Sequence, residues 1–256
     1  MISVRITAAT HTGTVRRRNE DYFGASELSC TSVDGEVVAV VVTGRTCLAV
    51  VADGLGGHPG GDIASRVAVE HLIDANPTDP DALLKAFHAA NEAMYDAMSQ
   101  PRGVREMGAT AAAVLVMANG LAVVNVGDSA VFECVDERLV QLSTDDVPDR
   151  ALQLPGIPSS VVTQTLGGRR ELVDIEPHLY SDEFGASRRV LLCTDGLTNF
   201  VTRDRISETL RDSTGHAAVE RLVQLALEAG GRDNVTVVLL EPVSLGDMTS
   251  SEEDPA

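Results

Sequence analysis

The chain has 256 residues, 44% of them hydrophobic, and a formal net charge of −18. This length and composition suit one domain with a large core, and the negative charge argues against nucleic acid or an anionic membrane as a partner. No apolar stretch approaches the length of a membrane span, no leader segment is evident, and the four cysteines lack metal-binding spacing. We therefore expect a reduced, cytoplasmic protein, and we expect it to be a monomer.

Strand-like and helix-like patterns follow one another in the first half. Residues 5–11 alternate as in a strand, and residues 37–43 and 46–52 are predicted to form a hairpin. Apolar side chains then recur at helical spacing in two segments, residues 62–73 and 81–98.

The second half begins with four predicted strands. A polar loop at residues 143–160 follows them and is long enough to be functional. Two more strands and two helices lead to a last strand. In chain order these elements are strands at 109–117, 121–126, 131–135, 139–142, 161–166 and 190–194, helices at 203–211 and 216–229, and a strand at 235–241.

Blocks of strands that alternate with pairs of helices indicate an α+β fold rather than a doubly wound one. No linker rich in proline, glycine or serine divides the chain. We expect residues 1–242 to form one domain and residues 243–256 to form an acidic, disordered tail.

Four of the apolar strands have an aspartate at one end. Apolar runs lead into Asp53, Asp128 and Asp195, each beside a glycine, and Asp233 stands just before the last strand. A carboxylate at the rim of a buried strand needs a partner, and without a nearby lysine or cysteine a hard cation held by oxygen is expected. One Asp-Gly pair is ordinary turn chemistry, but its repetition favours a metal site built from strand ends.

Six short motifs occur in a fixed order. They are Gly-x-Val-Arg-x-x-Asn-Glu-Asp at 13–21, Val-Ala-Asp-Gly-x-Gly-Gly-His at 51–58, Gly-Ala-Thr at 108–110, Val-Gly-Asp-Ser at 126–129, Cys-Thr-Asp-Gly at 193–196 and Arg-Asp-Asn-Val-Thr-Val at 232–237. Their ordered combination resembles the metal-dependent protein serine/threonine phosphatases of the protein phosphatase 2C family. The resemblance extends over nearly the full chain, from about residue 6 to residue 240.

The resemblance implies two packed antiparallel β-sheets flanked by antiparallel helix pairs, with two Mn²⁺ or Mg²⁺ ions at one end. Asp53 is expected to bridge the ions, and the Gly54 carbonyl to bind the second. Asp195 and Asp233 are expected to complete the protein ligands of the first. Two ions about 3.5–4 Å apart can activate one bridging water for in-line attack on phosphorus.

The resemblance also implies roles for residues around this centre. Glu20 and Asp21 are expected to act mostly through coordinated waters. Asp128, together with Asp195, is expected to form a third, weaker metal site. Arg16 is expected to hold the substrate phosphate, because a guanidinium fork matches two phosphate oxygens.

The proton donor for the leaving oxygen is a separate question. Eukaryotic relatives have a histidine directly after the Asp-Gly pair, where this chain has Leu55. His58 is the candidate general acid or substrate-positioning residue, and a surface histidine near a helix start is the alternative reading. Three more departures concern substrate handling: Ala130 replaces the usual arginine, His11 a frequent aspartate, and Val147 follows two aspartates where a histidine is usual.

The function expected from these features is hydrolysis of phosphoserine and phosphothreonine in proteins by a metal-activated bridging water, opposing bacterial Ser/Thr kinases. Regulation of a sigma-factor antagonist cascade is an alternative role for the same chemistry. A non-catalytic phosphoprotein-binding relative would be favoured by loss of a core aspartate, and all of them are present. A structural metal-binding domain would take up metal without turnover.

Overall fold

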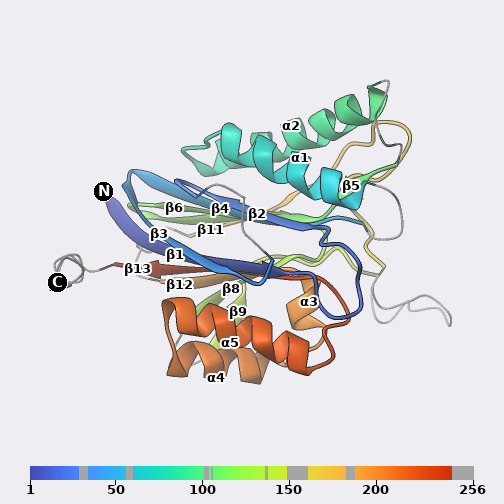
Figure 1. Cartoon of the computed structure of the whole chain (residues 1–256). Helices are drawn as coiled ribbons and strands as arrows, with labels where there is room; N and C mark the ends of the chain where they lie inside the picture. Colours follow the sequence, from blue (N-terminus) through green and yellow to red (C-terminus); the bar gives the residue numbers. More distant parts are fainter. Residues whose placement is uncertain are drawn as a thin grey trace, which may run out of the picture.

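Two antiparallel sheets lie face to face, and helices cover each outer face (Figure 1). This computed structural model describes residues 1–28, 34–55, 60–100, 104, 106–135, 138–148, 161–182 and 188–243. The layered arrangement confirms the predicted α+β class.

The strands divide between two main sheets and one small pair. The first sheet contains β1 (Ile2–His11), β3 (Val37–Gly44), β8 (Ala130–Val135), β9 (Arg138–Gln141), β12 (Arg189–Cys193) and β13 (Val235–Pro242). The second contains β2 (Asp21–Ala25), β4 (Thr46–Asp53), β6 (Ala111–Met117), β7 (Gly120–Val126) and β11 (His178–Asp182), and the small pair is β5 (Gly108–Ala109) with β10 (Leu166–Gly167). Their spatial orders are β3-β1-β13-β12-β8-β9 and β11-β7-β6-β4-β2.

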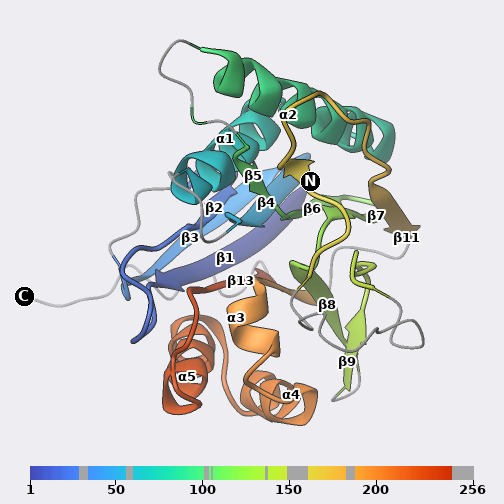
Figure 2. The same ribbon diagram turned by 90° about the vertical axis from the view of Figure 1, so that its right-hand side faces the viewer.

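The predicted helices are confirmed, with ends within a few residues of those expected. The helices α1 (Gly61–Asp74) and α2 (Pro80–Ser99) pack on the second sheet, and α4 (Arg203–Asp212) and α5 (Gly215–Glu228) pack on the first. Asp79 is the N-cap of α2, and its side chain accepts a hydrogen bond from the Ala82 N–H at 2.8 Å. A short helix, α3 (Asp195–Thr198), lies at one end of the molecule, which Figure 2 shows facing the viewer.

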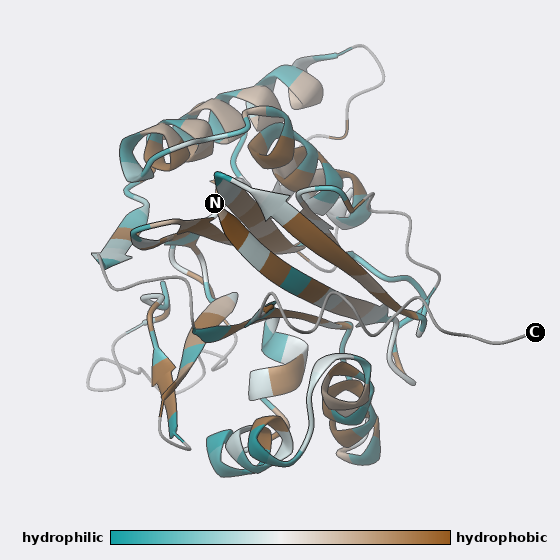
Figure 3. Ribbon diagram, turned by 90° about the vertical axis from the view of Figure 1, so that its left-hand side faces the viewer, coloured by the Kyte–Doolittle hydropathy of each residue, from teal (hydrophilic) through white to brown (hydrophobic). Residues whose placement is uncertain are grey.

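Three apolar layers hold the elements together: one between each helix pair and its sheet, and one between the sheets. Central strands are buried on both faces, so neighbouring residues point into different layers. In β4, Val50 packs under α1 and α2 while Val51 packs between the sheets. This explains the continuous apolar runs of the sequence, and the hydrophobic colour is concentrated in these strands and on the inner helix faces (Figure 3).

The predicted hairpin of residues 37–43 and 46–52 is wrong. β3 pairs with β1 in the first sheet, whereas β4 pairs with β2 and β6 in the second. The short connection therefore crosses between the layers instead of closing a hairpin. β4 is buried on both faces and needs a partner on each side, whereas the partly exposed β3 lies at a sheet edge.

The strand predicted at residues 161–166 is also wrong, because only Leu166–Gly167 form a strand there, the two-residue β10. Instead, the Thr163 N–H donates to the Asp146 carbonyl at 2.7 Å, and the Gln164 side chain bonds to Glu176. Two strands, β2 and β11, were not predicted. They are short, and β11 is a half-exposed edge strand without the apolar run that marks the central strands.

None of the helices in the described residues is long and apolar enough to cross a membrane. Most of the predicted loop at 143–160, namely residues 149–160, lies outside the described residues, as does most of the predicted tail, residues 244–256.

Candidate active site

Residues from distant parts of the chain meet in a pocket of about 230 Å³ at the end of the sheets where β4 ends and α3 begins. Among the described residues that line it, five are acidic and one is basic. The charged residues are Arg16, Glu20, Asp53, Asp128, Asp195 and Asp233. Among the described residues, the structure therefore brings together every charged side chain that the sequence singled out for the site except Asp21, which lies behind the pocket.

Asp53 is the last residue of β4, at the centre of this pocket. Its backbone is held on one side by Thr110, which donates its N–H to the Asp53 carbonyl at 2.9 Å and accepts the Asp53 N–H at 3.2 Å. The Thr110 hydroxyl also contacts that of Ser129 at 2.7 Å. Burial raises the pKa of Asp53 well above its usual value, and the surrounding carboxylates Asp21 and Asp195 add to the shift.

Gly54 lies where no side chain fits. A Cβ at this position would approach the Gly61 carbonyl oxygen to 2.1 Å. The Gly54 N–H donates to the Glu20 carbonyl at 3.0 Å, which fixes the backbone beside Asp53. Glycine is required here because the start of α1 passes directly over the end of β4.

Asp21 lies behind the pocket, directly opposite Asp53 in the β2–β4 ladder. Only 5% of the residue is exposed, and its Oδ2 accepts hydrogen bonds from the hydroxyls of Thr194 and Thr236, both at 2.7 Å. Its Oδ1 is buried and has no hydrogen-bond partner. Burial raises the pKa of Asp21 to about 7, although the two threonines favour the ionised form. An unpartnered, buried carboxylate oxygen is available to a cation or to its water.

Asp195 is the first residue of α3, where backbone N–H groups favour an anion. Its Oδ2 accepts a hydrogen bond from the Asn199 side chain at 2.8 Å. Burial raises the pKa of Asp195, and the nearby Asp233 adds to the shift. The next residue must be glycine, since a Cβ on Gly196 would lie 1.7 Å from the Asn234 carbonyl oxygen.

Asp233 and Arg16 form an ion pair at the rim of the pocket. The distance from Arg16 Nη2 to Asp233 Oδ2 is 2.7 Å, and 43% of the arginine side chain is exposed. Hydrogen bonding to Asp233 raises the pKa of Arg16 further, so the guanidinium stays charged. The predicted phosphate-binding arginine thus contacts one of the predicted metal ligands.

Asp128 lies in the turn between β7 and β8, on another side of the pocket. Burial raises the pKa of Asp128 to about 7, and the charge of Asp195 adds to the shift. The preceding Gly127 N–H donates to Asp146 Oδ2 at 2.8 Å, so a residue that does not line the pocket holds this turn.

Asn234 is a site residue to which the sequence analysis gave no role. Its Oδ1 accepts the Glu20 N–H at 2.8 Å, and its Nδ2 donates to the carbonyls of Thr12 and Arg18, both at 2.9 Å. It therefore fastens the N-terminal loop that presents Arg16 and Glu20. Asn234 and Thr110 each belong to one of the six motifs, so the sequence marks both positions. Their role in holding the backbone of the site becomes visible only from their hydrogen bonds.

Glu20 itself lines the pocket beside the start of α1. Burial raises its pKa, and the nearby Arg16 acts in the opposite direction. His58 lies outside the described residues. His11 accepts the Gly13 N–H at Nδ1, 2.8 Å away, and Ala130 is buried in the apolar layer under α4 and α5.

In the part of the pocket that the structure describes, the acidic residues outnumber the single basic residue, Arg16. Arg16 faces five acidic residues, and the carboxylates raise one another's pKa values. Among the described residues, no three His, Cys, Asp or Glu side chains converge closely enough to enclose an ion by themselves. Carboxylate oxygens are the ligands that Mg²⁺ and similar hard cations prefer, so the acidic lining of this pocket fits such ions.

Comparisons with known proteins agree with this geometry. The sequence pattern of "Protein phosphatase 2C" matches residues 24–229. The chain belongs to the protein phosphatase 2C family.

Named relatives in this family include the serine/threonine protein phosphatase PstP of Mycobacterium tuberculosis, which is 32% identical over 94% of this chain. This chain spans 45% of the length of PstP. The serine/threonine phosphatase stp of Listeria monocytogenes is 28% identical over 91% of this chain and 93% of its own length.

Solved structures of PstP have the same fold. One crystal structure superposes with a TM-score of 0.78 at 30% identity and covers 95% of this chain and 100% of its own. A second, of the PstP catalytic domain in complex with 2 manganese ions, gives a TM-score of 0.77 with the same identity and coverage.

Replacing Gly196 by alanine should displace α3 and lower the free energy of unfolding by about 1–3 kcal/mol, as overpacking typically does. The physical reason is the 1.7 Å approach of the new Cβ to the Asn234 carbonyl. The control is Gly44→Ala, whose Cβ would lie 3.2 Å from the nearest atom, the Thr46 carbonyl oxygen. Denaturant melts measure both variants, and equal stability of Gly196→Ala and wild type would contradict the packing argument.

Without metal, the protein should lose stability as the pH rises from about 4 to about 7. The carboxyls of Asp21 and Asp128 have pKa values of about 7 when folded and the ordinary 3.8 when unfolded. In this interval the folded state holds more protons, so deprotonation favours unfolding, and the loss levels off above pH 7. Thermal melts in chelator measure it. Asp21→Asn should flatten the slope, and a stability that rises with pH across this interval would contradict the burial of these groups.

Proposed function

We propose that this protein hydrolyses phosphoserine and phosphothreonine in other proteins with the aid of two Mn²⁺ or Mg²⁺ ions. The observation that supports it most is the pocket in which Arg16 faces five acidic residues, each from a different segment of the chain. The names of the relatives support the substrate class, and the two manganese ions of the PstP structure support the metal. Phosphoproteins made by Ser/Thr kinases are the proposed substrates.

Asp53, the Gly54 carbonyl, Asp195 and Asp233 are the proposed metal ligands. The bound ions would lower the pKa of a shared water so that it attacks phosphorus without a covalent enzyme intermediate. Glu20 and Asp21 are proposed to hold coordinated waters. The unpartnered Oδ1 of Asp21 supports this role.

Arg16 is proposed to bind the phosphate. A guanidinium has five N–H donors, and the ion pair with Asp233 uses a single nitrogen, Nη2, which leaves donors for two phosphate oxygens. Its charge also offsets the negative charge that the phosphate adds to an already acidic pocket. We retain the prediction that His58 protonates the oxygen of the leaving serine or threonine.

A third and weaker metal site is proposed at Asp128 and Asp195. The charge of Asp195 raises the pKa of Asp128, which supports the proximity of the two carboxylates. Residues 1–242 are proposed as one phosphatase domain. A cytoplasmic location and a monomeric state stay predictions.

The decisive experiment measures hydrolysis of a phosphothreonine peptide by purified protein in chelator and after addition of Mn²⁺. Turnover should require the metal, and Asp53→Asn should lower it at least about hundredfold, a barrier increase of about 2.7 kcal/mol. Asp74→Asn is the matched control, because Asp74 is an exposed aspartate at the end of α1. Metal-independent turnover, or wild-type turnover by Asp53→Asn, would refute the proposal.

Arg16→Ala should raise KM roughly ten- to hundredfold, since a charge-assisted hydrogen bond contributes about 1.5–3 kcal/mol. The neighbouring, exposed Arg17 provides the control variant Arg17→Ala. Metal affinity, measured by calorimetry, should stay nearly unchanged in both. A collapse of metal affinity in Arg16→Ala would show that Arg16 organises the aspartates instead of binding phosphate.

A further inference from the structure

A second pocket, of about 340 Å³, adjoins the acidic one. Leu55 and Val162 line both pockets, so the two are continuous. The second pocket is here called the flanking groove, and two chain segments, called its walls, line it: residues 162–165 with 167–169, and residues 173–175. A polypeptide whose phosphorylated residue enters the acidic pocket has neighbouring side chains within reach of this groove.

A buried amide from α2 sets the width of the flanking groove. Asn91 is 3% exposed, and its Oδ1 accepts the Gly167 N–H at 2.9 Å. Its Nδ2 donates to the Val173 carbonyl at 2.9 Å. One side chain therefore holds both walls, and the groove exists before any substrate binds.

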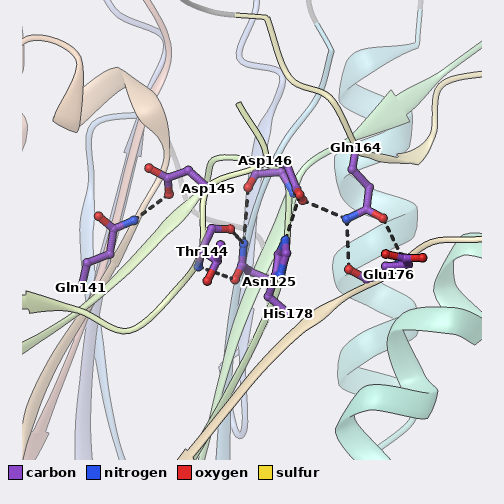
Figure 4. Close-up of polar contacts among 9 residues, drawn as sticks. Asn125, Gln141, Thr144, Asp145, Asp146, Gln164, Glu176 and His178 are labelled. Carbon is purple, nitrogen blue, oxygen red and sulfur yellow. Dashed lines mark hydrogen bonds and ion pairs between the residues drawn. The ribbon is translucent and has the colours of Figure 1, made fainter. Parts of the chain in front are cut away.

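Gln164 fastens the walls at a second point (Figure 4). Its Nε2 donates to the Glu176 carbonyl at 3.1 Å, and its Oε1 accepts the Glu176 N–H at 2.6 Å. The same Nε2 donates to Asp146 Oδ2 at 3.0 Å. Asp146 also accepts from the Gly127 N–H, next to Asp128, so the groove is held at a fixed position relative to the acidic pocket. Preorganisation of this kind lowers the entropic cost of binding.

The lining of the flanking groove is apolar where it meets the acidic pocket. Leu55 and Val162, which line both pockets, are half-buried. Elsewhere in the groove, 43% of Val173 is exposed to solvent, and Thr163, Gln164 and Thr165 are polar. Arg169 and Asp174 are the charged residues among its described lining, and their charges cancel. An electrically neutral, partly apolar groove on a protein of net charge −18 suits a hydrophobic side chain better than a charged one.

We propose that the flanking groove is a substrate subsite that accepts an apolar side chain close in sequence to the phosphorylated residue. This inference rests on the proposed phosphatase function and specifies its substrate class: phosphoproteins with a leucine, isoleucine, valine or methionine near the phosphoserine or phosphothreonine. Binding of that side chain adds apolar burial to the charge-based recognition of the phosphate.

The test uses phosphothreonine peptides of otherwise alanine and serine residues, with one leucine moved through the three positions on either side. At one position, leucine should raise kcat/KM about five- to tenfold over serine, a tenfold ratio being about 1.4 kcal/mol. Val173→Ser should reduce that leucine-to-serine ratio to near one. The control is Val140→Ser on β9, because Val140 is exposed to a similar extent, 45%, and should keep the full ratio.

Each result decides between the alternatives. Turnover of all peptides without preference for leucine at any position would overturn the subsite alone. A parallel series with glutamate in place of leucine completes the test, and higher turnover of that series would overturn the apolar character of the subsite and point to Arg169. Absence of turnover on every peptide with Mn²⁺ present would overturn the phosphatase function and the subsite with it. Thermal melts of Val173→Ser should match those of wild type, so a changed ratio reports the groove and not the fold.

Discussion

Repulsion between carboxylates in one desolvated pocket is the constraint on which the rest of this structure depends. Asp53 meets its neighbours where burial and like charge both favour the protonated form. Such a cluster costs free energy in the absence of cations, and Arg16 offsets only part of it. The fold must therefore supply enough stability elsewhere to keep these side chains together.

That stability comes from the three apolar layers and from polar side chains that fix the strand ends. Central strands buried on both faces contribute hydrophobic burial on each side, which is the dominant favourable term in folding. Thr110, Asn234 and the threonine pair that contacts Asp21 bond to the backbone or carboxylates at the rim. Glycines at positions 54 and 196 permit approaches that any side chain would prevent. These uncharged residues, rather than the charged ones, hold the backbone around the acidic pocket in place.

A second polar network extends from the acidic pocket to the flanking groove. Asp146 connects the turn before Asp128 with Gln164 and with His178 of β11, whose Nε2 lies 2.8 Å from Asp146 Oδ1 (Figure 4). These contacts replace the backbone ladder that the region around residues 161–165 lacks. They hold a segment that has no strand pairing of its own.

Much of this protein follows from local patterns in its sequence. Helical periodicity located α1, α2, α4 and α5, and the apolar runs located the buried strands. The aspartates at strand ends indicated a cation site, and the ordered motifs indicated the family. The inferences about helices, buried strands and family succeed because side-chain spacing and burial on both faces are local properties. The cation site stays a prediction, which rests on the need to pair a buried carboxylate.

Only the tertiary structure decided which strands are neighbours and what the uncharged motif residues do. β3 and β4 adjoin in sequence yet belong to different sheets, because strand pairing depends on burial of whole faces across the molecule. The edge strand β11 and the segment around Gln164 lack an apolar pattern, since their order comes from contacts with distant residues. The flanking groove has no sequence signature for the same reason: its walls meet through Asn91, 76 residues before Gly167 and 82 before Val173.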